Sequence, residues 1–172
     1  MPDFYVYLIS SLPMLHFGIK PPFTFTRFLE ACQDKIPESD ADIIKSLTGG
    51  YTSELSCPAL KRWRNFDTAL RNELVKIRAS RKHVDYLKYI RGDEYIEPYI
   101  AHIAMSAHRT HSILEAERLL DRERWLILDE LAAGHYFDLD FLIAYALKLL
   151  ILERWERINS ADKPRLLKEV LN

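Results

Sequence analysis

Residues 58–91 read PALKRWRNFDTALRNELVKIRASRKHVDYLKYIR, and this stretch decides the fold. Proline is favourable at the first position of a helix, because its missing N–H would have no partner there. Apolar side chains then recur every seven residues, at Trp63, Leu70, Ile77 and Val84. This spacing is typical of a coiled-coil-like seam. We therefore predict a long amphipathic helix that begins at Pro58 and ends at Gly92, where a left-handed residue is favourable.

Two shorter helices are expected ahead of this stretch. Thr24 and Ser39 are both residues that cap the free amides at a helix start, so a helix is predicted after each. Gly49-Gly50 then stops the second helix. Residues 4–12 stay ambiguous, because their apolar run fits either a strand or a buried helix.

The second half of the chain carries similar signals. Pro98 is expected to start a return helix, and the capping-box pattern of Ser112 to Glu115 predicts that this helix breaks near Thr110. Asp138 then caps an apolar helix over 138–158.

These elements predict an all-α fold, a bundle of long amphipathic antiparallel helices with a coiled-coil-like hairpin. We expect one helical domain over 1–172, with a long hairpin at 58–133 and a buried core helix at 138–158. The 172 residues suit a single domain. Hydrophobic residues make up 48% of the chain and only 5 glycines interrupt it, so a sizeable core and long elements are expected.

Charge is unevenly distributed although the formal net charge is only -1. Residues 61–91 hold 10 Lys/Arg against 3 Asp/Glu, while residues 92–172 hold 10 against 15. A basic helix of this kind attracts phosphates or an acidic protein surface. Lys61 adds to the positive charge of this helix, and the candidate partner-binding residues are Arg62, Arg64, Arg71, Arg78, Arg81, Lys82 and Lys88.

Two other interpretations of the basic helix remain open. It could be the solvated flank of a coiled coil, screened by acidic residues of the return helix at Glu115, Glu117, Asp121 and Glu123. It could also bind nucleic acid. Trp63 and Phe66 belong to the seam, however, and exposed aromatic side chains for base stacking are not obvious, so nucleic acid is the less favoured partner.

No set of residues supports catalysis or a cofactor. Phosphate-binding glycine loops and the Gly-x-Ser-x-Gly nucleophile elbow do not occur in the sequence. His108, His111 and Glu115 have the i, i+3, i+7 spacing of a ligand set on one helix face. The expected break near Thr110 would destroy that face. We therefore expect a protein that is not an enzyme, with no metal, cofactor or small-molecule substrate.

The cysteines and the apolar segments indicate a cytoplasmic protein. Cys32 and Cys57 are too few for a disulfide framework, which favours a reducing compartment. The apolar run at 4–12 is short and lacks a positive region before it, so no signal peptide is indicated. The run at 139–152 is shorter than the ~20 residues that cross a bilayer, so no transmembrane segment is expected.

Several passages resemble an uncharacterised bacterial family encoded beside V-type ATPase subunits. In the first part of the chain they are YVYLISSLP at 5–13, with Phe17-Gly18 and KPPF at 20–23. In the last part they are LDEL at 128–131, HYFD at 135–138 and AYALKLLILERW at 144–155. Together the passages span nearly the whole chain.

The passage at 144–155 is also similar in style to a helix of the V/A-type ATPase central-stalk subunit called C or d. That subunit is an all-helical socket between the membrane rotor and the shaft, but this chain is far shorter and lacks its threefold repeat. The resemblance implies a non-catalytic subunit or assembly factor of a bacterial V-type ATPase. Its partners would be rotor or central-stalk subunits, and any association with the inner membrane would be peripheral, through that complex.

Overall fold

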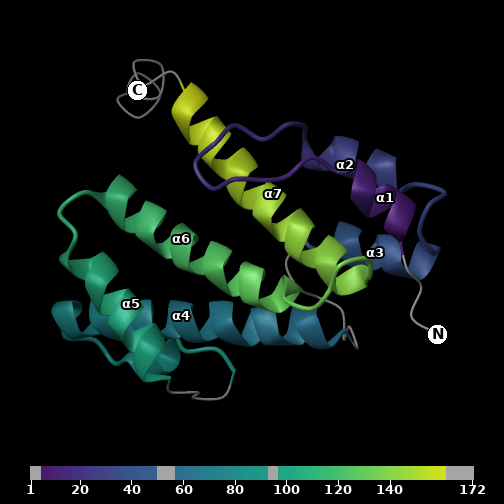
Figure 1. Ribbon diagram of the computed structural model, residues 1–172. Coiled ribbons are helices and arrows are strands. Elements are labelled where there is room, and N and C mark those ends of the chain that lie inside the picture. Colours follow the sequence, from purple (N-terminus) through teal and green to yellow (C-terminus); the bar gives the residue numbers. More distant parts are fainter. Residues whose placement is uncertain (1–4, 50–56, 93–96, 162–172) are drawn as a thin grey trace. The chain divides into compact units, whose positions relative to one another are not determined.

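The computed structural model describes residues 5–49, 57–92 and 97–161 (Figure 1). Within these ranges the chain forms seven α-helices and one 3-10 helix, and no residue lies in a β-strand. The prediction of an all-α fold is confirmed. The chain divides into two compact units, residues 1–53 with 135–172 (unit 1) and residues 54–134 (unit 2). The single domain expected over 1–172 stays a prediction.

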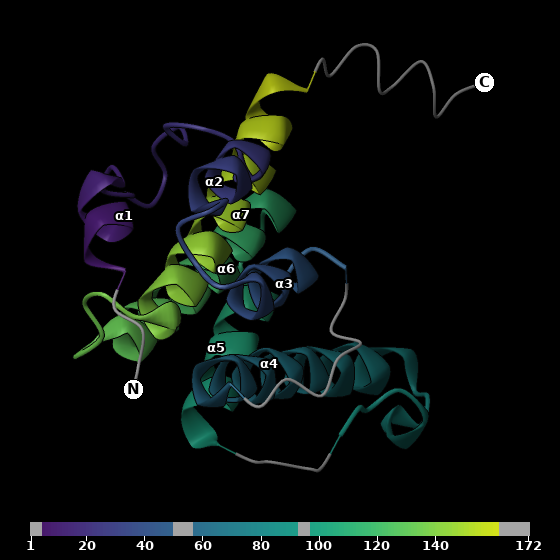
Figure 2. The same ribbon diagram turned by 90° about the vertical axis from the view of Figure 1, so that its right-hand side faces the viewer.

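Unit 1 is built around its longest helix, α7. Its helices are α1 (Val6–Ser11), α2 (Phe25–Cys32), α3 (Glu38–Ser46) and α7 (Leu139–Ser160). Both α2 and α3 pack on α7, as Figure 2 shows. The buried side chains of α7 run from Leu142 to Trp155 and include every residue from 142 to 147. A helix buried on more than one face belongs to the interior of its unit.

The segment that was ambiguous in the sequence is helical. Residues 6–11 form α1, and contacts with distant residues hold its start in place. The Tyr5 backbone N–H donates to the Phe137 carbonyl at 2.5 Å, and the Tyr5 hydroxyl donates to Asp40 Oδ2 at 2.5 Å. Because these partners lie far away in the sequence, local periodicity could not choose between helix and strand.

Two of the expected helix caps in unit 1 are confirmed and one is wrong. The Thr24 hydroxyl accepts a hydrogen bond from the Arg27 amide at 3.2 Å, and the Asp138 carboxylate accepts one from the Phe141 amide at 3.2 Å. Ser39 does not cap α3, because Pro37 is already the N-cap residue and Ser39 lies in the first turn. The Pro37 carbonyl accepts from the Ala41 amide at 3.0 Å, so the helix starts directly behind the proline.

Unit 2 holds three α-helices that pack against one another. Its elements are α4 (Pro58–Lys82), the 3-10 helix η1 (Tyr86–Lys88), α5 (Pro98–Arg109) and α6 (Ile113–Ala132). Fully buried aliphatic side chains come from all three helices and include Leu60, Leu70, Ile100 and Leu128. The break expected near Thr110 is confirmed, since Ser112 caps α6 and accepts from the Glu115 amide at 3.4 Å.

The prediction that the long helix runs to Gly92 is wrong, because α4 ends at Lys82. His83 adopts a left-handed conformation with φ 52, and the chain then turns back along α4. The buried Asn72 holds the returning chain: its Nδ2 donates to the Arg91 carbonyl at 2.9 Å, and its Oδ1 accepts from the Arg91 amide at 3.1 Å. This tertiary contact fixes the return and leaves Gly92, with φ 68, outside the helix.

The seven-residue seam is buried only in its first half. Trp63 and Leu70 are buried, Ile77 is half-buried, and Val84 is 46% exposed beyond the end of α4. The coiled-coil-like detail of the hairpin predicted at 58–133 is therefore not confirmed. In the described part of the chain, no helix combines the length and the apolar character that spanning a membrane requires.

Candidate partner-binding surface

The structure distributes the seven candidate cations over two elements. Lys88 belongs to η1 and the other six belong to α4. Arg62 lies in the first turns of α4, whereas Arg78, Arg81 and Lys82 follow one another at its C-terminal end. All of the seven except Arg64 are exposed. Arg64 is half-buried and its Nε and Nη2 atoms are shielded from solvent, so this guanidinium is poorly placed to meet a partner.

Arg71 is exposed but already engaged within the protein. Its Nε atom donates to Asp67 Oδ2 at 2.7 Å, and 63% of the Arg71 side chain stays accessible while Asp67 is buried. A guanidinium held on a buried carboxylate contributes less free positive charge to the surface. Arg71 and Arg64 are therefore the weakest members of the predicted set.

Arg78, Arg81 and Lys82 form what we call the cationic end of α4. Among the residues that the structure describes, none of these three side chains makes a hydrogen bond or an ion pair. All three are exposed at the last turns of the helix, where cations are favoured by the helix dipole. The charge of this end is thus available to an external anion.

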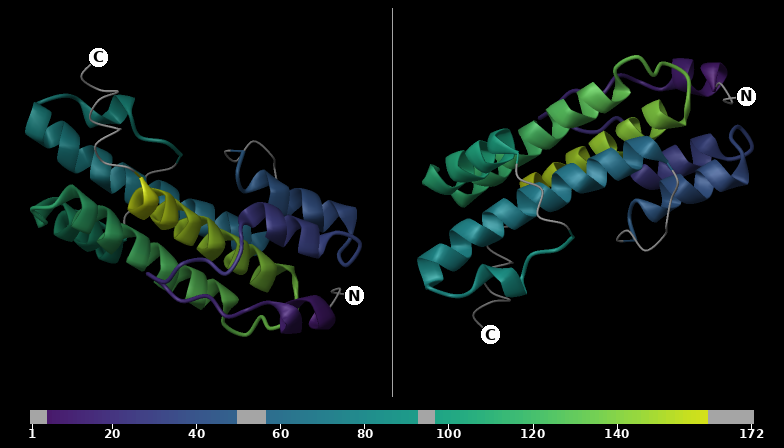
Figure 3. Two further views of the ribbon diagram at one scale, coloured as in Figure 1. Left: turned by 90° about the horizontal axis from the view of Figure 1, so that it is seen from above. Right: turned by 90° about the horizontal axis from the view of Figure 1, so that it is seen from below.

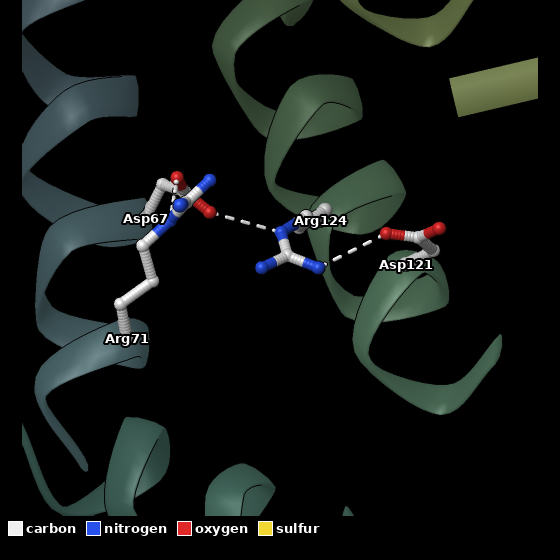
Figure 4. Close-up of polar contacts among 4 residues, drawn as sticks. All are labelled: Asp67, Arg71, Asp121 and Arg124. Atoms are coloured by element: carbon white, nitrogen blue, oxygen red, sulfur yellow. Dashed lines mark hydrogen bonds and ion pairs between the residues drawn. The ribbon is translucent and has the colours of Figure 1, made fainter. Parts of the chain in front are cut away.

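An ion network that the sequence pattern did not reveal joins α4 to α6 (Figure 4). Asp67 accepts from Arg71 and, through Oδ1, from Arg124 Nε at 2.9 Å. Arg124 Nη1 also donates to Asp121 Oδ1 at 3.0 Å. The side chains of Asp67, Asp121 and Arg124 are 5%, 1% and 11% exposed. Two arginines thus balance two aspartates in a mostly buried site.

The network fixes the protonated state of its central arginine. Burial acts to lower the pKa of Arg124, but the neighbouring carboxylates of Asp67 and Asp121 outweigh that effect and the net pKa is raised. A balanced buried network contributes to the choice of one packing arrangement more than to net stability. Its pair of Asp67 with Arg124 connects α4 to α6. The i, i+4 spacing of Asp67 and Arg71 was a local signal for it, whereas the pairing of Asp67 with Arg124 was not.

Two of the four acidic residues expected to screen the basic helix are engaged within unit 2. Asp121 bonds to Arg124, and Glu123 accepts a hydrogen bond from the Tyr99 hydroxyl at 2.5 Å. That bond is the main reason why the pKa of Tyr99 is raised to about 12, with burial adding to it. Of the other two, Glu117 lines one pocket together with Arg78 and Arg81.

The histidines do not form the continuous face that a metal site on one helix would need. His108 belongs to α5, His111 lies in the turn after it, and Glu115 belongs to α6. In the described ranges, no group of three or more His, Cys, Asp or Glu side chains is placed to hold a metal ion.

Exposed aromatic side chains do occur near the basic segment, contrary to the expectation from the sequence. Trp63 and Phe66 are buried as predicted, but Tyr86 is 37% exposed and Tyr89 is 59% exposed. Both lie in the turn that follows α4, and Lys76 Nζ lies 6.0 Å from the centre of the Tyr86 ring. Their exposure depends on the early end of α4, which the seven-residue pattern did not predict.

Comparison with known proteins finds a family that matches part of the chain. Residues 97–172, less than half of the chain, are similar to a family described as proteins of unknown function, DUF2764. No curated protein matches the chain, and no solved structure does either.

Proposed function

We propose that this chain is a non-catalytic subunit or assembly factor of a bacterial V-type ATPase, which docks to rotor or central-stalk subunits. The proposal starts from the resemblance of the passages at 5–23 and 128–155 to a family encoded beside such subunits. In this role the chain works in the cytoplasm and reaches the membrane only through the complex. It transmits or stabilises contacts and performs no chemistry.

The observation that carries the proposal is the cationic end of α4. Arg78, Arg81 and Lys82 are exposed and have no ionic partner among the described residues. The ion pairs of Arg124 with Asp67 and Asp121 connect the same helix to α6. Charge complementarity with an acidic partner surface then gives orientation and speed of association.

The test is co-purification of the tagged full-length chain with the V-type ATPase from bacterial extracts. The double variant R78E/R81E should lower association by about 100-fold, because like charges placed across an interface cost several kcal/mol. Arg71 is left unchanged, since a glutamate there would face Asp67 and destabilise the fold. The matched control K35E/K61E reverses two exposed charges outside the cationic end.

The expected result is loss of the complex in R78E/R81E and its retention in K35E/K61E, with the helical circular dichroism signal unchanged in both. Equal association of the wild type and R78E/R81E would remove the cationic end from the proposal. Absence of every ATPase subunit from the wild-type purification would overturn the function itself.

A second candidate function, nucleic-acid binding, is favoured by the exposed rings of Tyr86 and Tyr89. Aromatic rings beside cations bind single strands through base stacking, at about 1–3 kcal/mol per base. If this candidate is right, a single-stranded RNA should bind at low salt and dissociate steeply as salt rises. Tyr89→Ala should then weaken binding, whereas Tyr7→Ala, which removes an 87% exposed ring in unit 1, should not. No binding at low salt would dispose of this candidate.

A further inference from the structure

A pocket of about 290 Å³ lies in unit 2, between α4, α5 and the start of α6. The C-terminal part of α4 and the turn between α5 and α6 meet at the same end of the unit, as Figure 3 shows. The volume is at the lower limit of ligand pockets, which suits a small molecule better than a large cofactor.

The charged lining of the pocket is dominated by cations. Arg78 and Arg81 are three residues apart on α4, so they lie on neighbouring positions of one helix face. The opposite wall contributes His108 and His111, and Glu117 is the carboxylate in the lining. Two arginines against one glutamate leave a formal charge of +1 when both histidines are neutral. Neither arginine has an ion pair within the described residues, so their donors are available to a ligand.

The rest of the lining is largely apolar. Leu74 and Ile77 on α4 and Ala116 on α6 are half-buried, and Leu120 is buried. Such walls cannot replace the hydration shell of a bare inorganic ion. They favour a ligand that carries an apolar body next to its charged group.

The donor set matches phosphate better than carboxylate. Two guanidinium groups offer several N–H donors in fixed forks, more than the two oxygens of one carboxylate can use well. The first turn of α6, which begins at Ile113 in the pocket wall, adds the positive end of its helix dipole. We infer that this pocket binds a small organic phosphate, with Arg78 and Arg81 holding the phosphate and the aliphatic wall holding the organic part.

The inference is independent of the docking proposal, although both use Arg78 and Arg81. It is tested by titrating the full-length protein with phenyl phosphate and following binding by calorimetry. Benzyl alcohol, with a similar ring and no charge, serves as the matched ligand. The variant R78Q/R81Q removes both guanidinium groups. Its control K61Q/K82Q removes the same charge from exposed positions of α4 that do not line the pocket.

Phenyl phosphate should bind the wild type, and R78Q/R81Q should lower its affinity by about tenfold or more, because hydrogen bonds to charged groups are among the strong ones. K61Q/K82Q should bind as the wild type does. If both variants lost the same affinity for phenyl phosphate, general attraction by a basic helix would explain the binding, and the inference would be overturned. Equal binding of benzyl alcohol, or no binding of phenyl phosphate, would also overturn it.

A variant that fills the pocket separates the two proposals. Ala116→Leu adds bulk to the wall without changing any charge, and leucine is nearly as favourable in a helix as alanine. It should abolish phenyl phosphate binding while leaving association with the ATPase unchanged. Undiminished binding of phenyl phosphate by this variant would place the ligand elsewhere and refute the pocket.

Discussion

The substitution Asp67→Ala tests the buried network that joins α4 to α6. It removes the acceptor shared by Arg71 and Arg124 and leaves the mostly buried Arg124 with Asp121 as its remaining carboxylate in the network. Breaking a buried ion pair on one side costs about 3–5 kcal/mol of folding free energy. Because Asp121 still neutralises part of the Arg124 charge, we expect a loss of folding free energy at the lower end of this range, about 3 kcal/mol.

The comparison variant is Arg71→Ala, which removes the exposed cation of the same network. The Arg71 side chain is 63% exposed, so solvent screens its pair with Asp67 and its loss should cost about 0.5 kcal/mol. Urea unfolding followed by circular dichroism gives both values. With a slope of about 2 kcal/mol per M, the midpoint should fall by about 1.5 M for Asp67→Ala and by about 0.25 M for Arg71→Ala. Equal small shifts for the two variants would refute the network as a link between the helices.

Three further outcomes are expected. Ser112→Ala should lower the free energy of unfolding by about 1 kcal/mol, because the N-cap hydrogen bond from the Glu115 amide is lost. Chemical denaturation measures this change, and an unchanged midpoint would show that Ser112 does not stabilise α6. Burial raises the pKa of the Cys32 thiol to about 11, so Cys32 should resist iodoacetamide at pH 9 in the native protein. The stability that the buried neutral thiol contributes is present below pH 9 and should be lost as the pH rises through 11. Peptide mapping that finds rapid labelling of Cys32 would contradict this. The hydrogen bond to Glu123 raises the pKa of Tyr99 to about 12. Tyr99→Phe should therefore remove the tyrosine that ionises near pH 12 in an absorbance titration. An unaltered titration curve would show that the bond is absent in solution.

The parts of the fold that could be predicted from sequence are those set by neighbouring residues. Thr24, Ser112 and Asp138 each accept a bond from an amide three residues ahead, so a local pattern contains the whole interaction. The end of α4 could not be predicted in this way. It depends on a left-handed histidine at 83 and on a contact between Asn72 and a residue 19 positions later.

In the candidate site, too, the features set by neighbouring residues could be predicted and those set by tertiary contacts could not. Charge counts located the basic segment, and exposure agrees with the prediction at Arg78, Arg81 and Lys82. The burial of Arg64 depends on tertiary neighbours and had no signal in the sequence. The pairing of Arg71 with Asp67 follows an i, i+4 spacing, which a count of charges does not use. The pocket beside Arg78 was also out of reach of the sequence pattern, because its walls come from separate helices.

The pairing of Asn72 with Arg91 has a consequence for local motion. One side-chain amide satisfies both the N–H and the carbonyl of a single residue, so the two bonds form and break together. The bonds to Arg91 are therefore a latch on the end of the return segment after α4, and the contact of Lys76 with the Tyr86 ring holds its start. The Arg91 amide proton would exchange with deuterium whenever the latch opens, at a rate set by this local event and separate from the much rarer global unfolding.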